Sequence, residues 1–170
     1  MKTKRDVEFE RIFLTYKDQI YRLSISFAQD KELANDLFQE ILIRIWSNLE
    51  QFKGDSEMGT WIYRIAYNTA VTFSSKEKKR LDQNTGIEPS MEFREPENHS
   101  FEIEERFRLL YQAIGELSDS DRIFATLFLE GTSYKTVSEI TGISENYVAV
   151  KINRIKSLLT KKLNPSPHGK

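Results

Sequence analysis

The sequence predicts an all-α protein with two small helical domains joined by an acidic linker, the second domain carrying a helix-turn-helix. Apolar residues recur at steps of three and four along most of the chain, which is the spacing of amphipathic helices. Glycine and proline are scarce, at 7 and 4 of 170 residues, so few positions interrupt those helices. One acidic stretch without helical spacing separates the two halves, and its composition is typical of a flexible linker.

These boundaries give a first domain over residues 1–80, a linker over 81–103, a second domain over 104–164 and a tail over 165–170. The linker holds six acidic side chains and one basic side chain, whereas both domains carry a small excess of basic residues. The net charge of −1 and the pI of about 6.2 therefore hide an uneven distribution. Such asymmetry carries more information about partners than the overall charge does.

The first domain contains three segments with helical spacing. Apolar residues recur between Phe9 and Phe27, and a wide apolar stripe predicts a second helix over Lys31–Leu49. Asp30 stands where an N-cap is expected. The stretch Phe52–Thr60 holds two glycines and reads as a loop, after which a third helix is expected over Thr60–Lys79.

The second domain contains start and stop signals for several short helices followed by a longer helix. Its expected caps are Ser118, Ser133 and Ser144 at helix N-termini, with Gly131 and Gly142 at C-termini. The stretch "SYKTVSEITGISENYVAVKINRIK" offers a short helix, a glycine turn and a second helix, which are the parts of a helix-turn-helix.

The composition of the chain argues against several classes of function. The chain has no cysteine, no run of 18 apolar residues and a charged N-terminus without an apolar signal segment, so we expect a cytoplasmic protein without membrane insertion. The only histidines, His99 and His168, lie in the predicted linker and tail. No acid–base pair, metal-ligand cluster or glycine-rich phosphate loop is present, so we expect no cofactor, no metal site and no enzyme. Carboxylates such as Asp36 and Glu40, one turn apart, could face a metal, but a partner-binding or solvated helix face explains them better.

The last helix separates into two faces at about 100° per residue. Val148, Ile152 and Ile155 fall on the side expected to be core. Asn146 and Asn153 lie on the opposite side, where amides can pair with adenine in the major groove. From Gly142 onward the chain has six basic residues and one acidic residue, and the basic ones suit phosphates. A solvated face on an ordinary helical hairpin is the alternative on this pattern alone.

The third helix mixes aromatic side chains with polar donors and is followed by the basic run "KEKKR". Aromatic groups among basic ones suit unstacked single-stranded bases, each stack being worth about 1–3 kcal/mol. Trp61 fits a core position equally well, and the basic run alone fits a solvated helix end.

Three stretches carry a family resemblance: "ELANDLFQEILIRIW", "FKGDSEMGTWIYRIAYN" and "LSDSDRIFATLFLEGTSYKTVSEITGISENYVAVKINRIKSLL". In order and spacing they resemble an extracytoplasmic-function sigma factor, the smallest class of sigma factor of bacterial RNA polymerase. The first two stretches are fairly specific, whereas the helix-turn-helix alone is not. The resemblance implies a factor that binds core polymerase, recognises and melts the −10 element with its first domain and reads the −35 element with its second.

The resemblance also implies residue roles. Polymerase-binding positions are Asp36, Gln39, Glu40, Arg44 and Trp46. Positions for the −10 element are Lys53, Thr60, Trp61, Tyr63, Arg64, Tyr67 and Asn68. Positions for the −35 element are Ser144, Asn146, Tyr147, Ala149, Val150, Lys151, Asn153, Arg154 and Lys156. The implied partners are RNA polymerase core, promoter DNA and an anti-sigma factor, and the acidic linker is expected to thread near basic channels of the polymerase.

The sequence departs from the family at three places. Many relatives carry an acid where this chain has Thr72, a basic residue where it has Ser75, and a basic residue where it has Ala149. Three alternatives stand beside this resemblance: a transcription regulator that binds duplex DNA without polymerase, an enzyme, for which the sequence support is poor, and a helical adaptor that binds protein only.

Overall fold

The computed structural model describes residues 2–28, 30–83 and 101–164. All regular structure in those ranges is helical, which confirms the predicted fold class. The helices are α1 (Lys4–Phe27), α2 (Lys31–Asn48), the short 3₁₀ helix η1 (Leu49–Gln51), α3 (Met58–Gln83), α4 (Phe101–Gly115), α5 (Asp119–Leu129), α6 (Tyr134–Thr141) and α7 (Glu145–Leu163).

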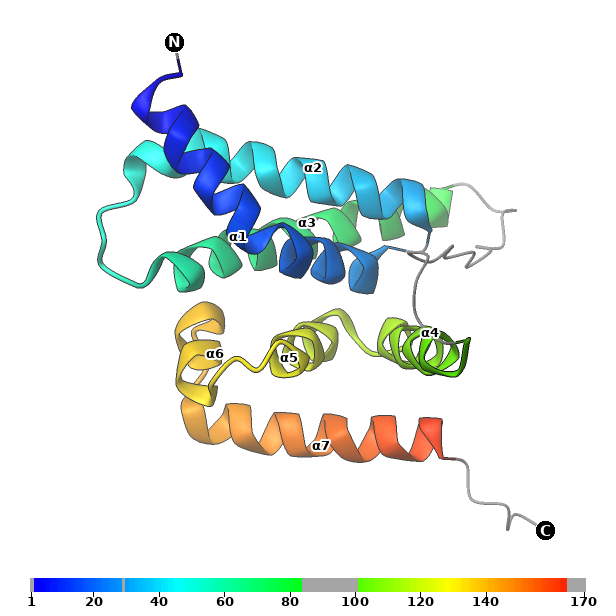
Figure 1. Ribbon diagram of the computed structural model, residues 1–170. Helices are drawn as coiled ribbons and strands as arrows, with labels where there is room; N and C mark the ends of the chain where they lie inside the picture. Colours follow the sequence, from blue (N-terminus) through cyan, green and yellow to red (C-terminus); the bar gives the residue numbers. More distant parts are fainter. Residues whose placement is uncertain (1, 29, 84–100, 165–170) are drawn as a thin grey trace, which may run out of the picture.

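The helices form two layers. Helices α1, α2 and α3 make one layer, and α4 to α7 make the other, with α5 and α6 facing the first layer and α7 on the far side (Figure 1). Helix α3 extends to Gln83 and α4 begins at Phe101, so each runs three residues into the stretch predicted as linker. Residues 84–100 and 165–170, which hold the rest of that linker and the tail, lie outside the described residues.

Most of the predicted caps form, and each satisfies a backbone donor or acceptor that a helix end leaves open. The side chains of Asp30, Ser118 and Ser133 each accept a hydrogen bond from the backbone N–H three residues later. Gly142 ends α6 at φ 74°, a left-handed conformation that strains any residue with a Cβ. Ser144 stands at the predicted cap position of α7, but its side chain makes no capping hydrogen bond.

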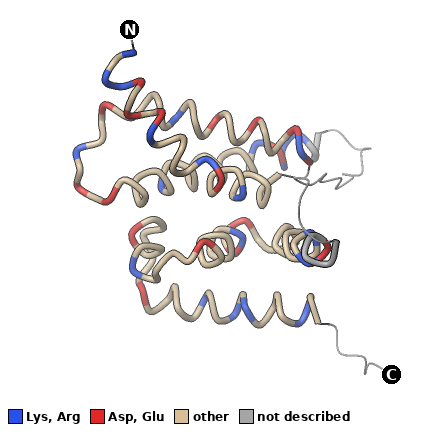
Figure 2. The backbone as a smooth tube through the Cα atoms, in the orientation of Figure 1, with Lys and Arg blue, Asp and Glu red and all other residues tan. Residues whose placement is uncertain are grey.

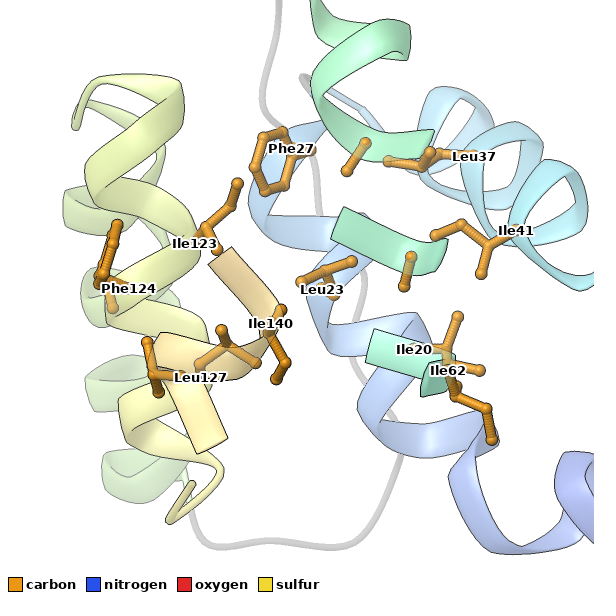
Figure 3. Packing of buried hydrophobic residues seen from close by; sticks show 14 of the residues in the cluster. Ile20, Leu23, Phe27, Leu37, Ile41, Ile62, Ile123, Phe124, Leu127 and Ile140 are labelled. Atoms are coloured by element: carbon orange, nitrogen blue, oxygen red, sulfur yellow. The ribbon is translucent and has the colours of Figure 1, made fainter. Parts of the chain in front are cut away.

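One continuous hydrophobic core joins the two layers. Leu37 and Ile41 of α2 and Ile62 of α3 fill the first layer, and all three are fully buried. Figure 3 shows Leu23 of α1 on the side that faces Ile140 of α6. Full burial of one such side chain stabilises the fold by about 1.5–3 kcal/mol, so contact between the layers adds to the stability of both.

Candidate nucleic-acid interface

Four of the five predicted polymerase-binding residues share the outer face of α2. Asp36, Gln39 and Arg44 are exposed. Glu40 is half-buried and forms an ion pair with Arg44, one turn along the helix, in which Arg44 donates a hydrogen bond at 2.9 Å. Ile43 lies among them and keeps 62% of its surface exposed. The sequence analysis missed Ile43, although its position one turn from Gln39 and Glu40 places it on the same face.

Trp46 lies apart from this face and packs against α1. Its ring meets the ring of Phe9 edge-on at 5.2 Å between centroids. The guanidinium of Arg5 lies 4.4 Å from the centre of the Trp46 ring and also donates to the Trp46 carbonyl oxygen. A second contact joins Arg5 to Glu50 at 3.3 Å. Trp46 therefore fastens the start of α1 to the end of α2, and this packing leaves little of its ring for a partner.

The predicted −10 residues divide into two groups along α3. Trp61 is half-buried against Phe52, with 5.2 Å between ring centroids, and Asn68 is exposed on the same side of the helix. Lys53 is exposed in the loop before α3.

The remaining −10 candidates are covered to different degrees. Thr60 is only 3% exposed, so its side chain is part of the core boundary. Tyr63 and Tyr67 are half-buried. The pKa of the Tyr63 hydroxyl is raised strongly, first by burial and then by the negative charge of Glu130. Arg64 is exposed, yet it donates a hydrogen bond at 2.8 Å to the backbone carbonyl of Glu139 in α6.

Two of the positions at which this chain differs from many relatives, Thr72 and Ser75, lie on α3. The hydroxyl of Thr72 donates to the carbonyl oxygen of Asn68 at 2.8 Å, and that of Ser75 donates to the carbonyl oxygen of Val71 at 2.9 Å. Both side chains therefore bond back to their own helix, as Ser and Thr often do inside helices.

Helices α6 and α7 form the predicted helix-turn-helix. Val148, Ile152 and Ile155 of α7 are buried, as the face analysis of the last helix predicted, and they meet Val137 and Ile140 of α6, which are also buried. The opposite face of α7 is open. It presents Asn146, Tyr147, Val150, Asn153 and Arg154, all of them exposed.

Two basic residues predicted to contact DNA are engaged within the domain. The ammonium of Lys151 lies 2.7 Å from the carboxylate of Asp121 in α5 and 5.1 Å from the centre of the Phe124 ring, with only 12% of its side chain exposed. Lys156 is exposed, and its ammonium lies 4.7 Å from the centre of the Phe128 ring. Lys151 therefore serves to hold α7 against α5, and it is poorly placed to reach a phosphate.

Asp121 forms a second ion pair with a cation of α7. Arg154 donates to its other carboxylate oxygen at 2.8 Å but keeps 61% of its side chain exposed. Burial raises the pKa of Asp121, but the hydrogen bond and charge of Lys151 and the charge of Arg154 outweigh burial and lower that pKa overall. Asp121 therefore stays ionised and fixes the rotation of α7 about its axis.

Two other predicted −35 positions differ in exposure. Ser144 is exposed at the start of α7, and Ala149 is half-buried.

Charged residues of both signs are spread over both layers, and basic residues recur along α7 (Figure 2). No helix within the described ranges is long and apolar enough to cross a membrane. The same ranges hold no cluster of three or more potential metal ligands.

Comparison with known proteins gives consistent matches. The sequence model of the family described as Sigma-70 region 2 matches residues 12–80. The RNA polymerase sigma-H factor of Pseudomonas aeruginosa is 29% identical over 92% of this chain and 86% of its own length. The ECF RNA polymerase sigma factor SigM of Bacillus subtilis is 29% identical over 91% of this chain and 97% of its own.

Two solved structures share the fold. The sigma factor RpoE of Bartonella quintana, determined with the anti-sigma factor NepR, has a TM-score of 0.78 at 20% identity and covers 92% of this chain and 97% of its own. CnrH, determined with the cytosolic domain of CnrY, has a TM-score of 0.67 at 17% identity over 93% of this chain and 88% of its own.

Proposed function

Because the chain belongs to the extracytoplasmic-function sigma factors of bacterial RNA polymerase, we propose that it recognises promoters with both of its helical layers. As a sigma factor it acts in transcription initiation and is not an enzyme. In the proposed division of labour, the layer of α1 to α3 binds core polymerase and the −10 element. The layer of α4 to α7 reads the −35 element. The observation that carries this proposal is the open polar face of α7, which is held against α5 by ion pairs from Lys151 and Arg154 to the buried carboxylate of Asp121.

We propose that α7 lies in the major groove of the −35 element. Asn146 and Asn153 can each pair two hydrogen bonds with adenine, and Val150 can pack on a thymine methyl group. These three residues are exposed and adjacent on one face. Arg154 is the basic residue best placed to contact a phosphate there, because most of its side chain remains exposed.

The surface proposed for the −10 element is the open side of α3 with its preceding loop. The rings of Trp61 and Phe52 form an aromatic pair, on which an unstacked base can rest. Asn68 offers an amide further along the helix, and Lys53 offers a positive charge for the phosphates of the DNA strand. Recognition of a single strand needs this combination of stacking and charge.

The proposed polymerase surface is the outer face of α2. It combines charges at Asp36, Glu40 and Arg44 with the exposed apolar side chain of Ile43. An apolar centre surrounded by charged groups is a common composition for a protein interface. The domain division at residues 1–80 and 104–164 follows from assigning these two roles, and a cytoplasmic location follows from acting with RNA polymerase.

We also propose an anti-sigma factor as a partner. The two solved structures of similar fold were determined with partners, one of them named as an anti-sigma factor. A groove of about 210 Å³ between α5 and α7, lined by apolar side chains such as Phe124, Phe128 and Leu159, belongs to the second layer and is open to such a partner.

Replacing residues of the α7 face tests the −35 assignment. On a mapped promoter, Asn153→Ala should relax the base preference at one position, at a cost of about 1–3 kcal/mol for the preferred base. Arg154→Ala should weaken binding for all sequences alike and reduce the salt dependence. The measurement is equilibrium binding of the chain with core polymerase to promoter variants at several salt concentrations. If both variants bind as the parent does, the assignment of this face is wrong.

A further inference from the structure

The aromatic pair of Phe52 and Trp61 is built from two elements that a loop separates. Phe52 directly follows the short helix η1, and its backbone N–H donates to the carbonyl oxygen of Leu49 at 3.2 Å. Trp61 lies near the start of α3, beyond the loop. The two ring centroids are 5.2 Å apart. The geometry of the pair therefore depends on how η1 and the start of α3 are placed relative to each other.

One residue of α1, Arg5, holds the η1 side of the pair. Its guanidinium donates a hydrogen bond to the backbone carbonyl of Trp46, lies 4.4 Å from the centre of the Trp46 ring and contacts Glu50 of η1 at 3.3 Å. The last turn of α2 contains no basic residue of its own. Carbonyl groups at a helix C-terminus need donors and favour a nearby cation. Arg5 supplies both from a neighbouring helix, at the point where α2 passes into η1.

Arg5 is itself held in place. Thr3 and Asp6 form a capping box at the start of α1, in which the Thr3 N–H donates to the Asp6 carboxylate at 2.6 Å and the Asp6 N–H donates to the Thr3 hydroxyl at 3.2 Å. The Arg5 side chain is 28% exposed, and its Nε is buried without a hydrogen-bond partner among the described residues. A buried donor without a partner costs free energy. The guanidinium is therefore confined here by its other contacts, unlike that of a freely solvated arginine.

A second residue of α1, Tyr16, holds the α3 side of the pair. A Cβ added to Gly59 would lie 3.2 Å from the hydroxyl oxygen of Tyr16 and 3.4 Å from the nearest carbon of its ring. Gly59 lies in the first turn of α3, two residues before Trp61, so the Tyr16 ring rests on the backbone of that turn. Tyr16 follows Arg5 by eleven residues, which is about three helical turns, so both side chains share one face of α1.

From these contacts we propose that Arg5 and Tyr16 are positioning residues for the −10 strand. Helix α1 runs beside both η1 and α3 (Figure 1). Arg5 acts through η1 on Phe52, and Tyr16 acts through the first turn of α3 on Trp61. Neither positioning residue contacts the DNA; each acts through the ring that it places. A base gains from stacking only where the rings have the right spacing and tilt, so displacing either end should weaken binding. The proposal rests on the proposed −10 function.

Arg5→Gln tests the η1 side. The probe is a single-stranded oligonucleotide with the non-template −10 sequence of a mapped promoter, carrying fluorescent 2-aminopurine at one base at a time. It is added to the full chain bound to core polymerase. Arg5→Gln should weaken binding about fivefold, the lower end of what one stacked base contributes, because the aromatic pair is no longer held at one spacing. The quenching of the stacked 2-aminopurine should decrease as well.

Arg11→Gln is the matched control for this test. It removes the same charge from the same helix, where Arg11 is exposed and pairs with neighbouring Glu8. This variant should bind the oligonucleotide as the parent does, and equal losses in both variants would show a general charge effect and overturn the proposal. Binding of duplex −35 DNA should be unchanged in Arg5→Gln. A parallel loss there would indicate a general loss of structure and would also overturn the proposal.

Trp61→Ala separates the positioning role from the −10 function on which it rests. In the Trp61→Ala background, Arg5→Gln should have little further effect, because the pair that Arg5 helps to place is already gone. Fully additive losses would overturn the positioning role and leave the −10 function in place. If Trp61→Ala alone binds the oligonucleotide as the parent does, the −10 function of the aromatic pair is refuted, and the positioning role with it.

Gly59→Ala tests the α3 side by rescue. The added methyl group must displace the Tyr16 ring or the first turn of α3 by a few tenths of an ångström. Affinity for the oligonucleotide should fall about threefold, less than a full stacked base contributes. Alanine favours helix over glycine, so the thermal midpoint of the free chain should fall little. Tyr16→Phe removes the nearest atom, so the double variant should recover most of the affinity. If the double variant binds as weakly as Gly59→Ala, the contact with Tyr16 does not place the pair, and the proposal fails.

Discussion

Asp121→Ala should lower the free energy of unfolding by about 3 kcal/mol, because it leaves the ammonium of Lys151, whose side chain is only 12% exposed, without its counter-charge. Asp121 is 6% exposed, and Lys151 is confined between its carboxylate and the Phe124 ring. The same change frees the rotation of α7, so binding to the −35 element should fall at temperatures where the chain is still folded. Urea unfolding followed by circular dichroism measures the first effect, and duplex binding measures the second.

Glu116→Ala is the matched control for this prediction. Glu116 forms an ion pair with Lys162 of α7, but both side chains are well exposed, so its loss should cost less than about 1 kcal/mol. Acid provides a second check. Because the pKa of Asp121 is lowered in the folded chain, its contribution is present above the pKa of the unfolded carboxyl and is lost as pH falls through the folded value. Equal stabilities of the two variants at neutral pH would contradict the role of Asp121.

Asp36→Arg should weaken binding to core polymerase at least about tenfold, or about 1.4 kcal/mol, without lowering the stability of the free chain. Asp36 is exposed, and within the described residues it forms no ion pair, so a change there removes no packing. Glu40, one turn away, is by contrast tied to Arg44. The measurements are affinity for fluorescently labelled core polymerase and the thermal midpoint of the free chain.

Glu10→Arg is the control for the polymerase surface. It makes the same charge reversal on an exposed residue of α1, whose ion-pair partner is the exposed Lys2. This variant should bind core polymerase as the parent does. If it loses as much affinity as Asp36→Arg, the loss reflects overall charge, and the assignment of the α2 face fails.

Local signals were enough to predict the helices and most of their ends. Asp30, Ser133 and Gly142 act through backbone groups within four residues, so the sequence alone indicates them. The buried side of α7 was predictable for the same reason, since Val148 and Ile152 follow helical spacing. The domain boundaries and the individual DNA contacts stay predictions.

Contacts between distant residues were not predictable in this way. Lys151 looks like a surface cation in the sequence, and only its packing against Asp121, thirty residues earlier, shows that it is held within the domain. Trp46 was grouped with the polymerase surface, but Arg5 and Phe9 of another helix enclose it. Helical spacing describes one helix at a time and carries no information about which neighbour covers a face.

Transcription with purified components tests the central claim most directly. Core polymerase, the full chain and genomic DNA fragments from the source bacterium are combined, and the 5′ ends of the transcripts are sequenced. The proposed function predicts that the chain co-elutes with core polymerase and that a defined set of start sites appears only when both are present. Those sites should share one sequence element near −10 and another near −35. A chain that neither co-elutes with core polymerase nor changes the set of start sites would contradict the proposed role in promoter recognition.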